Sequence, residues 1–265
     1  LFVGNVAAAK AGVRTLPSQC DYNRAWPGTR SPGTAEARLM QAVFDAVAGR
    51  RPFASIDIHN NTGLNPHYAC VNRLDERWFH LARLFSRTVV YFTEPVGVQS
   101  QAMARLCPAI TVECGRASES AGADHAAELV DAALHLREFP THPVPEQDLD
   151  LLHTAFIVKV PEAASFSFDG SPADYRFRAD LDHLNFRALP AGTALGRIAP
   201  GAPPLALQGE AGGRPVTGLF DYSDGQIRLR APLLPAMLSL DPDAVRLDCL
   251  CYLMERIGRD GRPQA

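Results

Sequence analysis

Hydrophobic positions recur at helical spacing in three segments of the first half of the chain, 36–49, 75–89 and 122–139. The first segment stops at Gly49, a residue type that favours the C-cap of a helix. The apolar stripe of this segment consists of Leu39, Val43, Ala46 and Val47. The pattern therefore predicts three amphipathic helices.

Short β-rich apolar runs alternate with these helical segments, at residues 53–56, 89–92 and 110–112. Runs of this length, placed between helices, are typical of strands in a sheet that is buried on both faces. Alternating strands and helices predict an α/β fold with a mostly parallel, mixed sheet and helices on both of its faces.

The composition changes after residue 138, where three prolines fall within the next few positions. Proline at this density keeps a chain extended, so residues 139–150 are predicted to be a linker. The expected domains are accordingly an N-terminal α/β domain over residues 1–138 and a small β-rich domain over residues 151–265.

The pattern in the second domain is one of short strands and turns. Glycine and proline cluster at residues 190–204 and 209–215, which predicts turns there. One helix is expected at residues 234–240, and residues 245–254 begin with the alternation of a strand.

The overall composition is that of a globular protein without a strong charge bias. The chain has 265 residues, 46% of them hydrophobic, and a net charge of −3. This balance indicates no nucleic-acid or membrane partner, and a homo-oligomer is compatible with it. The six cysteines form no Cys-x-x-Cys pair, which favours free thiols in a reducing cytoplasm.

Polar side chains follow two of the predicted strands. Asp57 and His59 come at the end of the run that starts at residue 53, and Glu113 ends the run that starts at residue 110. Open α/β sheets bind ligands at the carboxyl ends of their strands. A carboxylate beside a histidine is also how zinc enzymes orient a ligand. We therefore take His59 as a candidate metal ligand, Asp57 as its partner, and Glu113 as a candidate general acid/base.

Three strings of residues occur in a fixed order around these positions. Arg14 is followed by Asp-Tyr-Asn-Arg-Ala-Trp-Pro-Gly at 21–28, then by Asp-Ile-His-Asn at 57–60, and then by Ile-Thr-Val-Glu-Cys-Gly at 110–115. Together they resemble the succinylglutamate desuccinylase/aspartoacylase family, a branch of the zinc carboxypeptidase superfamily. The resemblance covers most of residues 4–116.

This resemblance implies a zinc-dependent hydrolase that cleaves the amide bond of a small N-acyl amino acid. It implies that Arg14 polarises the scissile carbonyl, and that Asn23 and Arg24 bind the substrate carboxylate. It further suggests Arg105 as a second substrate contact. It also implies a β-barrel-like C-terminal domain.

The family carries an early His-x-x-Glu that supplies two of its three zinc ligands. The residues before Gly4 hold no such string, so with His59 as the third ligand the other two are expected upstream of Leu1. One Zn²⁺ per chain is then the expected cofactor of the intact protein. Asp21 is expected to orient the loop of the first string. The run 1–3 has the apolar character of the middle of a strand.

Two other functions use the same residues. A carboxypeptidase-type metallopeptidase shares the chemistry, although a second domain over the site would exclude long peptides. A metal-free ligand-binding homologue is the alternative from a different class, and the missing His-x-x-Glu is the feature that favours it.

Overall fold

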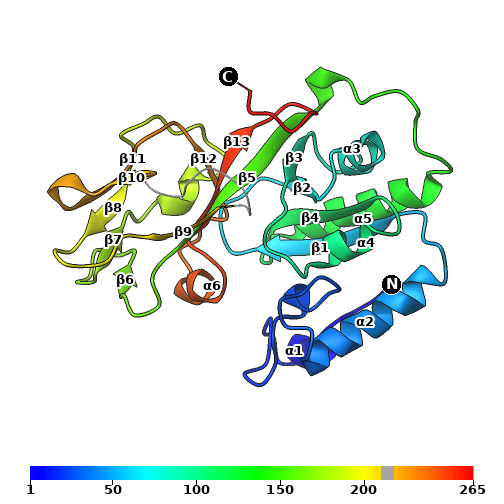
Figure 1. The fold of residues 1–265 in the computed structure, drawn as a ribbon, viewed down its shortest axis with the longest axis horizontal. Coiled ribbons are helices and arrows are strands. Elements are labelled where there is room, and N and C mark those ends of the chain that lie inside the picture. Colours follow the sequence, from blue (N-terminus) through cyan, green and yellow to red (C-terminus); the bar gives the residue numbers. More distant parts are fainter. Residues whose placement is uncertain (210–217, 265) are drawn as a thin grey trace.

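Two β-sheets form the framework of the protein (Figure 1). The computed structural model describes residues 1–209 and 218–264. The larger sheet consists, in spatial order, of β1 (Ser55–Asn61), β4 (Ala109–Arg116), β2 (Tyr68–Val71), β3 (Thr88–Tyr91), β5 (Asp150–Lys159), β13 (Cys251–Arg256) and β12 (Leu234–Ala236), with β9 (Ala206–Gly209) also paired to β5. The smaller sheet consists of β10 (Phe220–Asp221), β11 (Gln226–Leu229), β8 (Ala194–Ile198), β7 (Tyr175–Phe177) and β6 (Phe166–Ser167).

The larger sheet is mixed, which confirms the predicted fold class. β1 pairs in parallel with β4, β2 with β3, and β3 with β5, whereas β2 runs antiparallel to β4. All residues of β4 up to Gly115 are buried. Because successive side chains of a strand point to opposite faces, β4 is covered on both sides. The helices α3 (Glu76–Arg83), α4 (Gln99–Met103) and α5 (Ser120–His135) all pack against it.

The three predicted helices of the first half are confirmed, and two of them are shorter than predicted. α2 (Ala35–Ala48) begins after Thr34, whose hydroxyl accepts a hydrogen bond from the Ala37 amide, and ends at Gly49. α3 ends at Arg83 because the residues from Thr88 onward pair with β2 in the sheet. α5 ends at His135, where the next residue is extended. The remaining helices are α1 (Val6–Lys10) and α6 (Pro242–Leu247), with 3-10 turns η1 (Tyr22–Arg24), η2 (Glu146–Asp148), η3 (Leu181–Leu184) and η4 (Ser223–Gly225).

Three local predictions are wrong. Residues 234–240 are not helical, because β12 occupies their first part and pairs antiparallel with β13. The residues from 245 onward do not begin as a strand, since they complete α6, which is capped by Asp241 and has proline in its first turn. Residues 1–3 form no strand, because no neighbouring strand pairs with them. The turn predicted at 209–215 extends beyond the described residues.

The predicted boundary at 139–150 does not coincide with a break between sheets. β5 follows it directly and pairs in parallel with β3, and β13 and β12 extend the same sheet. Segments from both expected domains therefore meet side by side in the larger sheet. Within the described part of the chain, no helix has the length and apolar character needed to cross a membrane.

Candidate functional site

His59 and Glu113 are register partners in the parallel pair β1–β4. They lie toward the carboxyl ends of both strands, the edge at which open α/β sheets bind ligands. The register shifts between His59 and Asn61, which marks a bulge directly after the histidine. Bulges change the direction of side chains and are common beside active sites.

The imidazole of His59 is held by polar groups on two elements. Its Nε2 lies 3.0 Å from Oδ2 of Asp57 and 3.5 Å from Nδ2 of Asn23. Burial by itself would lower the pKa of His59, but the hydrogen bond and charge of Asp57, together with the charge of Glu113, raise this pKa to about 9. Asp57 thus lies against His59, where the sequence placed it as a partner.

The carboxyl group of Glu113 is buried at the base of the site. It accepts a hydrogen bond from Nδ2 of Asn61 at 3.3 Å, and Asn61 accepts one from Asn65 at 3.2 Å. Burial raises the pKa of Glu113, although the charge of His59 and the Asn61 hydrogen bond oppose this shift. A carboxyl group with a raised pKa is suited to accept a proton and pass it on.

The loop around η1 presents the cationic side of the site. Asp21 caps η1 by accepting a hydrogen bond from the Asn23 amide at 2.9 Å, and it also binds Arg14 at 2.7 Å. Burial would raise the pKa of Asp21, but the charge of Arg14 and the Asn23 amide hold it below its usual value. Asp21 therefore connects Arg14 with the start of η1.

Asn23 and Arg24 are positioned by contacts with the start of α4 and the segment before it. Oδ1 of Asn23 accepts a hydrogen bond from the Gln99 amide at 3.0 Å, so that Nδ2 is left to face His59. Gly97 has a φ of +79°, and a Cβ atom there would lie 2.5 Å from the Arg24 carbonyl oxygen. Only glycine permits this close approach of the two segments.

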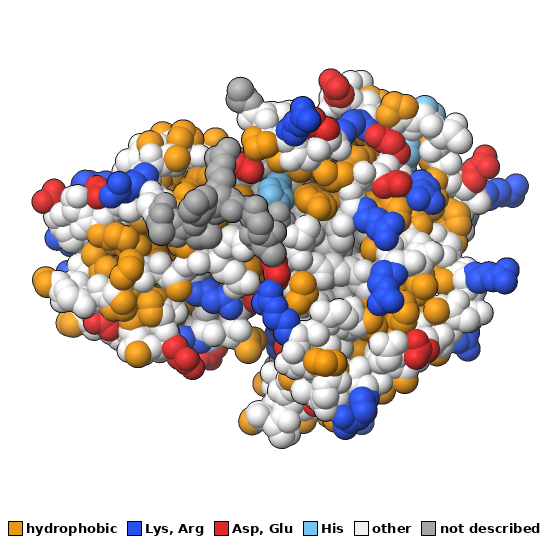
Figure 2. Space-filling model, in the orientation of Figure 1, with side chains coloured by type: hydrophobic (Ala, Val, Ile, Leu, Met, Phe, Trp, Pro, Cys, Tyr) orange, Lys and Arg blue, Asp and Glu red, His pale blue; other side chains and the backbone are white. Residues whose placement is uncertain are grey.

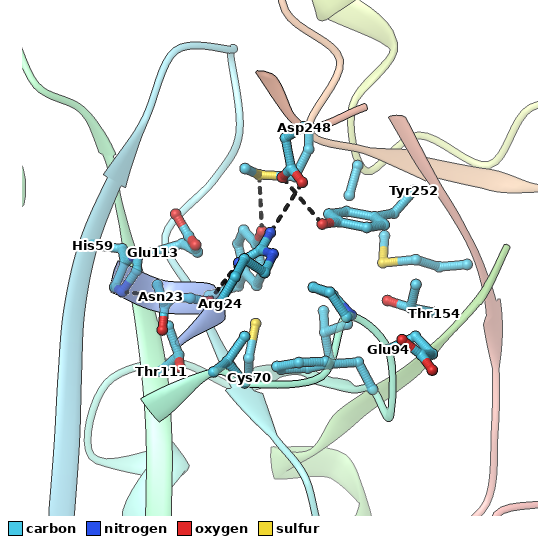
Figure 3. Close-up of a pocket in the computed structure, with 18 of the residues that line it drawn as sticks. Asn23, Arg24, His59, Cys70, Glu94, Thr111, Glu113, Thr154, Asp248 and Tyr252 are labelled. Carbon is cyan, nitrogen blue, oxygen red and sulfur yellow. Dashed lines mark hydrogen bonds and ion pairs between the residues drawn. The ribbon is translucent and has the colours of Figure 1, made fainter. Parts of the chain in front are cut away.

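Arg24 is joined to the C-terminal part of the chain. Its Nη1 donates to the Asn23 carbonyl at 2.8 Å, and its Nη2 donates to Oδ1 of Asp248 at 2.9 Å. The Tyr252 hydroxyl donates to the other oxygen of Asp248 at 3.3 Å. Figure 3 shows this chain of contacts across the middle of the site, with His59 and Glu113 on one side of Arg24 and Tyr252 and Thr154 on the other.

These side chains line one cavity of about 100 Å³. Its polar and charged lining residues include Arg14, Asn23, Arg24, His59, Glu94, Thr111, Glu113, Thr154 and Asp248. A neighbouring groove of about 940 Å³ shares part of this lining. The shared residues are Arg14, Asn23, His59, Asn60, Met237 and Asp248. The cavity that Glu113 lines and the groove therefore adjoin at these residues.

Among the predicted catalytic, substrate-binding and metal-binding residues, Arg105 is the one that does not line this cavity. Its guanidinium lies 5.1 Å from the centre of the Phe44 ring and lines a separate groove with Trp78. The physical reason is its position before β4, at the amino end of the strand, whereas Glu113 lies toward the carboxyl end. Cation–π contact with an aromatic ring is an ordinary structural use of arginine.

Asp248, Tyr252, Thr154 and Glu94 also line the cavity, and sequence reasoning did not single them out. Asp248 stands alone among apolar residues just before a strand, and this is the only signal that could have drawn attention to it. A lone carboxylate in such a position does not identify its partner, because Arg24 lies 224 positions away in the chain.

The described residues do not by themselves form a three-ligand zinc site. Across residues 1–209 and 218–264, no group of three His, Cys, Asp or Glu side chains is arranged to hold a metal ion. His59 is the only imidazole in the cavity lining, and its Nε2 contacts Asp57. Structural and catalytic zinc sites take at least three protein ligands. The described residues thus offer His59 as one of the expected ligands.

Comparison with known proteins bears on the family and the fold of the chain. A family sequence profile described as "Succinylglutamate desuccinylase/Aspartoacylase catalytic domain" matches residues 1–139. No curated protein sequence matches the chain closely enough to count as a relative.

Several solved structures share the fold at low sequence identity. Murine aminoacylase 3 superposes with a TM-score of 0.62 at 15% identity, covering 96% of this chain and 82% of that one. The succinylglutamate desuccinylase from Chromobacterium violaceum gives a TM-score of 0.58 at 15% identity, over 96% and 72% of the two chains. A succinylglutamate desuccinylase/aspartoacylase from Rhodobacter sphaeroides gives 0.59 at 14% identity, over 96% and 74%.

Proposed function

Because the chain belongs to the succinylglutamate desuccinylase/aspartoacylase family, we propose that it hydrolyses the amide bond of a small N-acyl amino acid. The observation that carries this proposal is the pairing of His59 with Glu113 at the carboxyl edge of β1 and β4, within the cavity that Asn23 and Arg24 also line. Acyl transfer to water needs a proton-transfer group, a group that stabilises the oxyanion and an anchor for the substrate. The cavity has a side chain of the right type for each.

Glu113 is the proton-transfer group. It accepts a proton from the attacking water as the water oxygen bonds to the carbonyl carbon. It then gives that proton to the nitrogen as the C–N bond breaks, leaving a carboxylic acid and an amine. Its burial and raised pKa favour both halves of this transfer. Arg14 faces the developing oxyanion, and the planar guanidinium of Arg24, with Asn23, binds the substrate carboxylate.

Zn²⁺ is part of the proposal, with His59 as one ligand and the remaining ligands outside the described residues. A direct measurement is zinc binding by equilibrium dialysis and elemental analysis, with His59→Ala as the matched variant. Zinc bound stoichiometrically and equally well by both proteins would contradict the assignment of His59.

The experiment that tests the activity is release of amine from a panel of N-acetyl amino acids, with and without added zinc. Glu113→Gln keeps the shape of the side chain but removes the proton acceptor, so kcat should fall by a factor on the order of 10²–10⁴. Binding of substrate, measured by calorimetry, should change little. Turnover that survives in Glu113→Gln would refute the role of this residue.

A second function, metal-free ligand binding, is favoured by one specific observation. The described residues contain no three-ligand group, and His59 is already engaged by Asp57. A protein of this kind would bind N-acyl amino acids without turnover at any zinc concentration. The same assay and calorimetry therefore separate the two functions.

We also propose a cytoplasmic location. All six cysteines are free, and all but Cys20 are buried. Free thiols are typical of proteins from reducing compartments.

A further inference from the structure

Both arginine side chains that line the cavity in the described part of the chain already contact a carboxylate. Arg14 binds Asp21 at 2.7 Å, and Arg24 binds Asp248 at 2.9 Å. His59, the proposed zinc ligand, lies 3.0 Å from Asp57.

Arg24 can still bind one substrate carboxylate. A guanidinium has five N–H donors, and two donor groups of Arg24 are used by Asn23 and Asp248. Arg24 is assigned to the α-carboxylate and Arg14 to the oxyanion, so no arginine among the described lining residues is left for a second substrate carboxylate. Burial of an unpaired charge is costly, so the cavity disfavours a dianionic substrate.

The wall beyond Arg24 is largely apolar, with Thr154 and Glu94 as its polar members. A cluster of buried residues from β2, β3, β5, β12 and β13 lies under this part of the cavity. Its members that line the cavity are Tyr68, Cys70, Val90, Ala236 and Met254, with Phe92, Met237 and Tyr252 packed against them. An aliphatic or aromatic group gains free energy by leaving water for such a surface.

Glu94 adds a negative group on this same side. In Figure 3 it lies near Thr154, across the site from His59 and Glu113. Its Oε1 accepts a hydrogen bond from Arg30 at 2.6 Å, while its Oε2 is buried and has no hydrogen-bond partner among the described residues. A substrate carboxylate placed here would face a like charge in a poorly solvated environment.

We propose that the cavity selects N-acyl amino acids that carry a single carboxylate and an apolar side chain, and that Glu94 excludes acidic side chains. This inference rests on the proposed function and specifies its substrate class. The carboxylate binds at Arg24, the scissile amide lies toward Glu113, and the side chain packs on the apolar wall.

The test compares three N-acetyl amino acids whose side chains have the same branching and number of heavy atoms: leucine, asparagine and aspartate. We expect kcat/KM and calorimetric affinity to be highest for leucine and lowest for aspartate, with a difference of roughly tenfold to a hundredfold. Equal or better binding of the aspartate derivative would overturn the proposal. So would a preference for N-acetyl-2,4-diaminobutyrate over N-acetylnorvaline, because the side chain would then be selected for a positive charge.

Glu94→Gln tests the residue itself. It should improve kcat/KM for the aspartate derivative several-fold relative to the leucine derivative, because only the like charge is removed. Asp131→Asn, an exposed charge change on α5, is the matched control and should leave both unaltered. An unchanged leucine-to-aspartate ratio in Glu94→Gln would refute the role of Glu94.

Measuring binding and turnover separately distinguishes failure of the proposed selectivity from failure of the proposed hydrolase activity. If no derivative is hydrolysed but leucine still binds more tightly than aspartate, the proposed hydrolase activity is wrong and the selectivity of the cavity stands. If all three derivatives are hydrolysed at similar rates and bind alike, the hydrolase stands and the selectivity is wrong.

Discussion

Asp248 binds Arg24 across 224 positions of the chain, with Oδ1 accepting a hydrogen bond from Nη2 at 2.9 Å. Burial would lower the pKa of Arg24, but the charges of Asp248 and Asp21 raise it. Asp248 lies outside the residues matched by the family profile. The C-terminal segment therefore helps to position the group that we assign to the substrate carboxylate.

Asp248→Asn should raise KM for N-acetyl amino acids by about tenfold, with little change in kcat. The reason is that a hydrogen bond to a charged group contributes about 1.5–3 kcal/mol, and this one is partly exposed to solvent. Steady-state kinetics measure both constants. Tyr252→Phe should have a smaller effect of the same kind, since it removes only the hydroxyl that binds Asp248.

An amide analogue of the substrate, in which the α-carboxylate is replaced by carboxamide, separates positioning from general damage. If Asp248 acts through Arg24 on the carboxylate, the effect of Asp248→Asn should shrink with this analogue. An equal loss with acid and amide would show that Asp248 only supports the fold.

Arg24→Ala should raise KM strongly, because a partly desolvated carboxylate loses a bidentate partner worth about 2–5 kcal/mol. Arg105→Ala is the variant to compare with Arg24→Ala. The structure places Arg105 over the Phe44 ring in a different groove, so KM should stay near that of the unaltered protein. A comparable rise in KM for Arg105→Ala would instead support the substrate contact that the family resemblance suggests.

Glu113→Gln should make the protein more stable at neutral pH. The pKa of Glu113 is raised from 4.5 in the folded protein, mainly by burial. A group with a raised folded pKa contributes stability that is fully present below its unfolded pKa and is lost as pH rises through the folded pKa. Glutamine has no ionised form, so the variant does not lose this stability as the pH rises.

Thermal unfolding of both proteins between pH 4 and pH 8 measures this effect. The advantage of Glu113→Gln should vanish near the lower end of that range, roughly where an unfolded glutamic acid becomes protonated. A variant that is less stable than the unaltered protein at pH 8 would contradict the direction of the shift.

Gly97→Ala should weaken the contact between the η1 loop and the segment before α4. The added Cβ would meet a strained φ of +79° and lie 2.5 Å from the Arg24 carbonyl oxygen. Gly192→Ala is the matched control, because its φ is +86° but nothing lies within 4 Å of the added atom. The control should cost about 1–2 kcal/mol of unfolding free energy from the left-handed conformation alone.

Denaturant unfolding compares the two glycine variants, and KM reports on the loop. Gly97→Ala should be clearly less stable than Gly192→Ala and should bind substrate more weakly, since Asn23 and Arg24 move with the loop. Equal stability of the two variants would show that the segments can separate without cost.

Much of the larger sheet and part of the site could be predicted from local patterns. The alternation of apolar runs and helices indicated the α/β fold. The polar residues that end two of these runs indicated that His59 and Glu113 would lie at one edge, and the register of β1 and β4 pairs them directly. The prediction failed where pairing partners decide the local structure, as at β12, which is a strand only because β13 lies beside it.

By itself, the sequence determined which residues can carry the chemistry, because residue type and position at a strand end are local properties of the chain. Only the tertiary structure decided which of them meet. Arg24 faces Asp248 and Tyr252 because β13 joins the same sheet as β1 through β5, β3, β2 and β4. Arg105, a residue of the same type, lies at the other end of β4 against Phe44. Such long-range neighbours depend on strand order and register, which are set by the burial of many side chains at once and not by any single short motif.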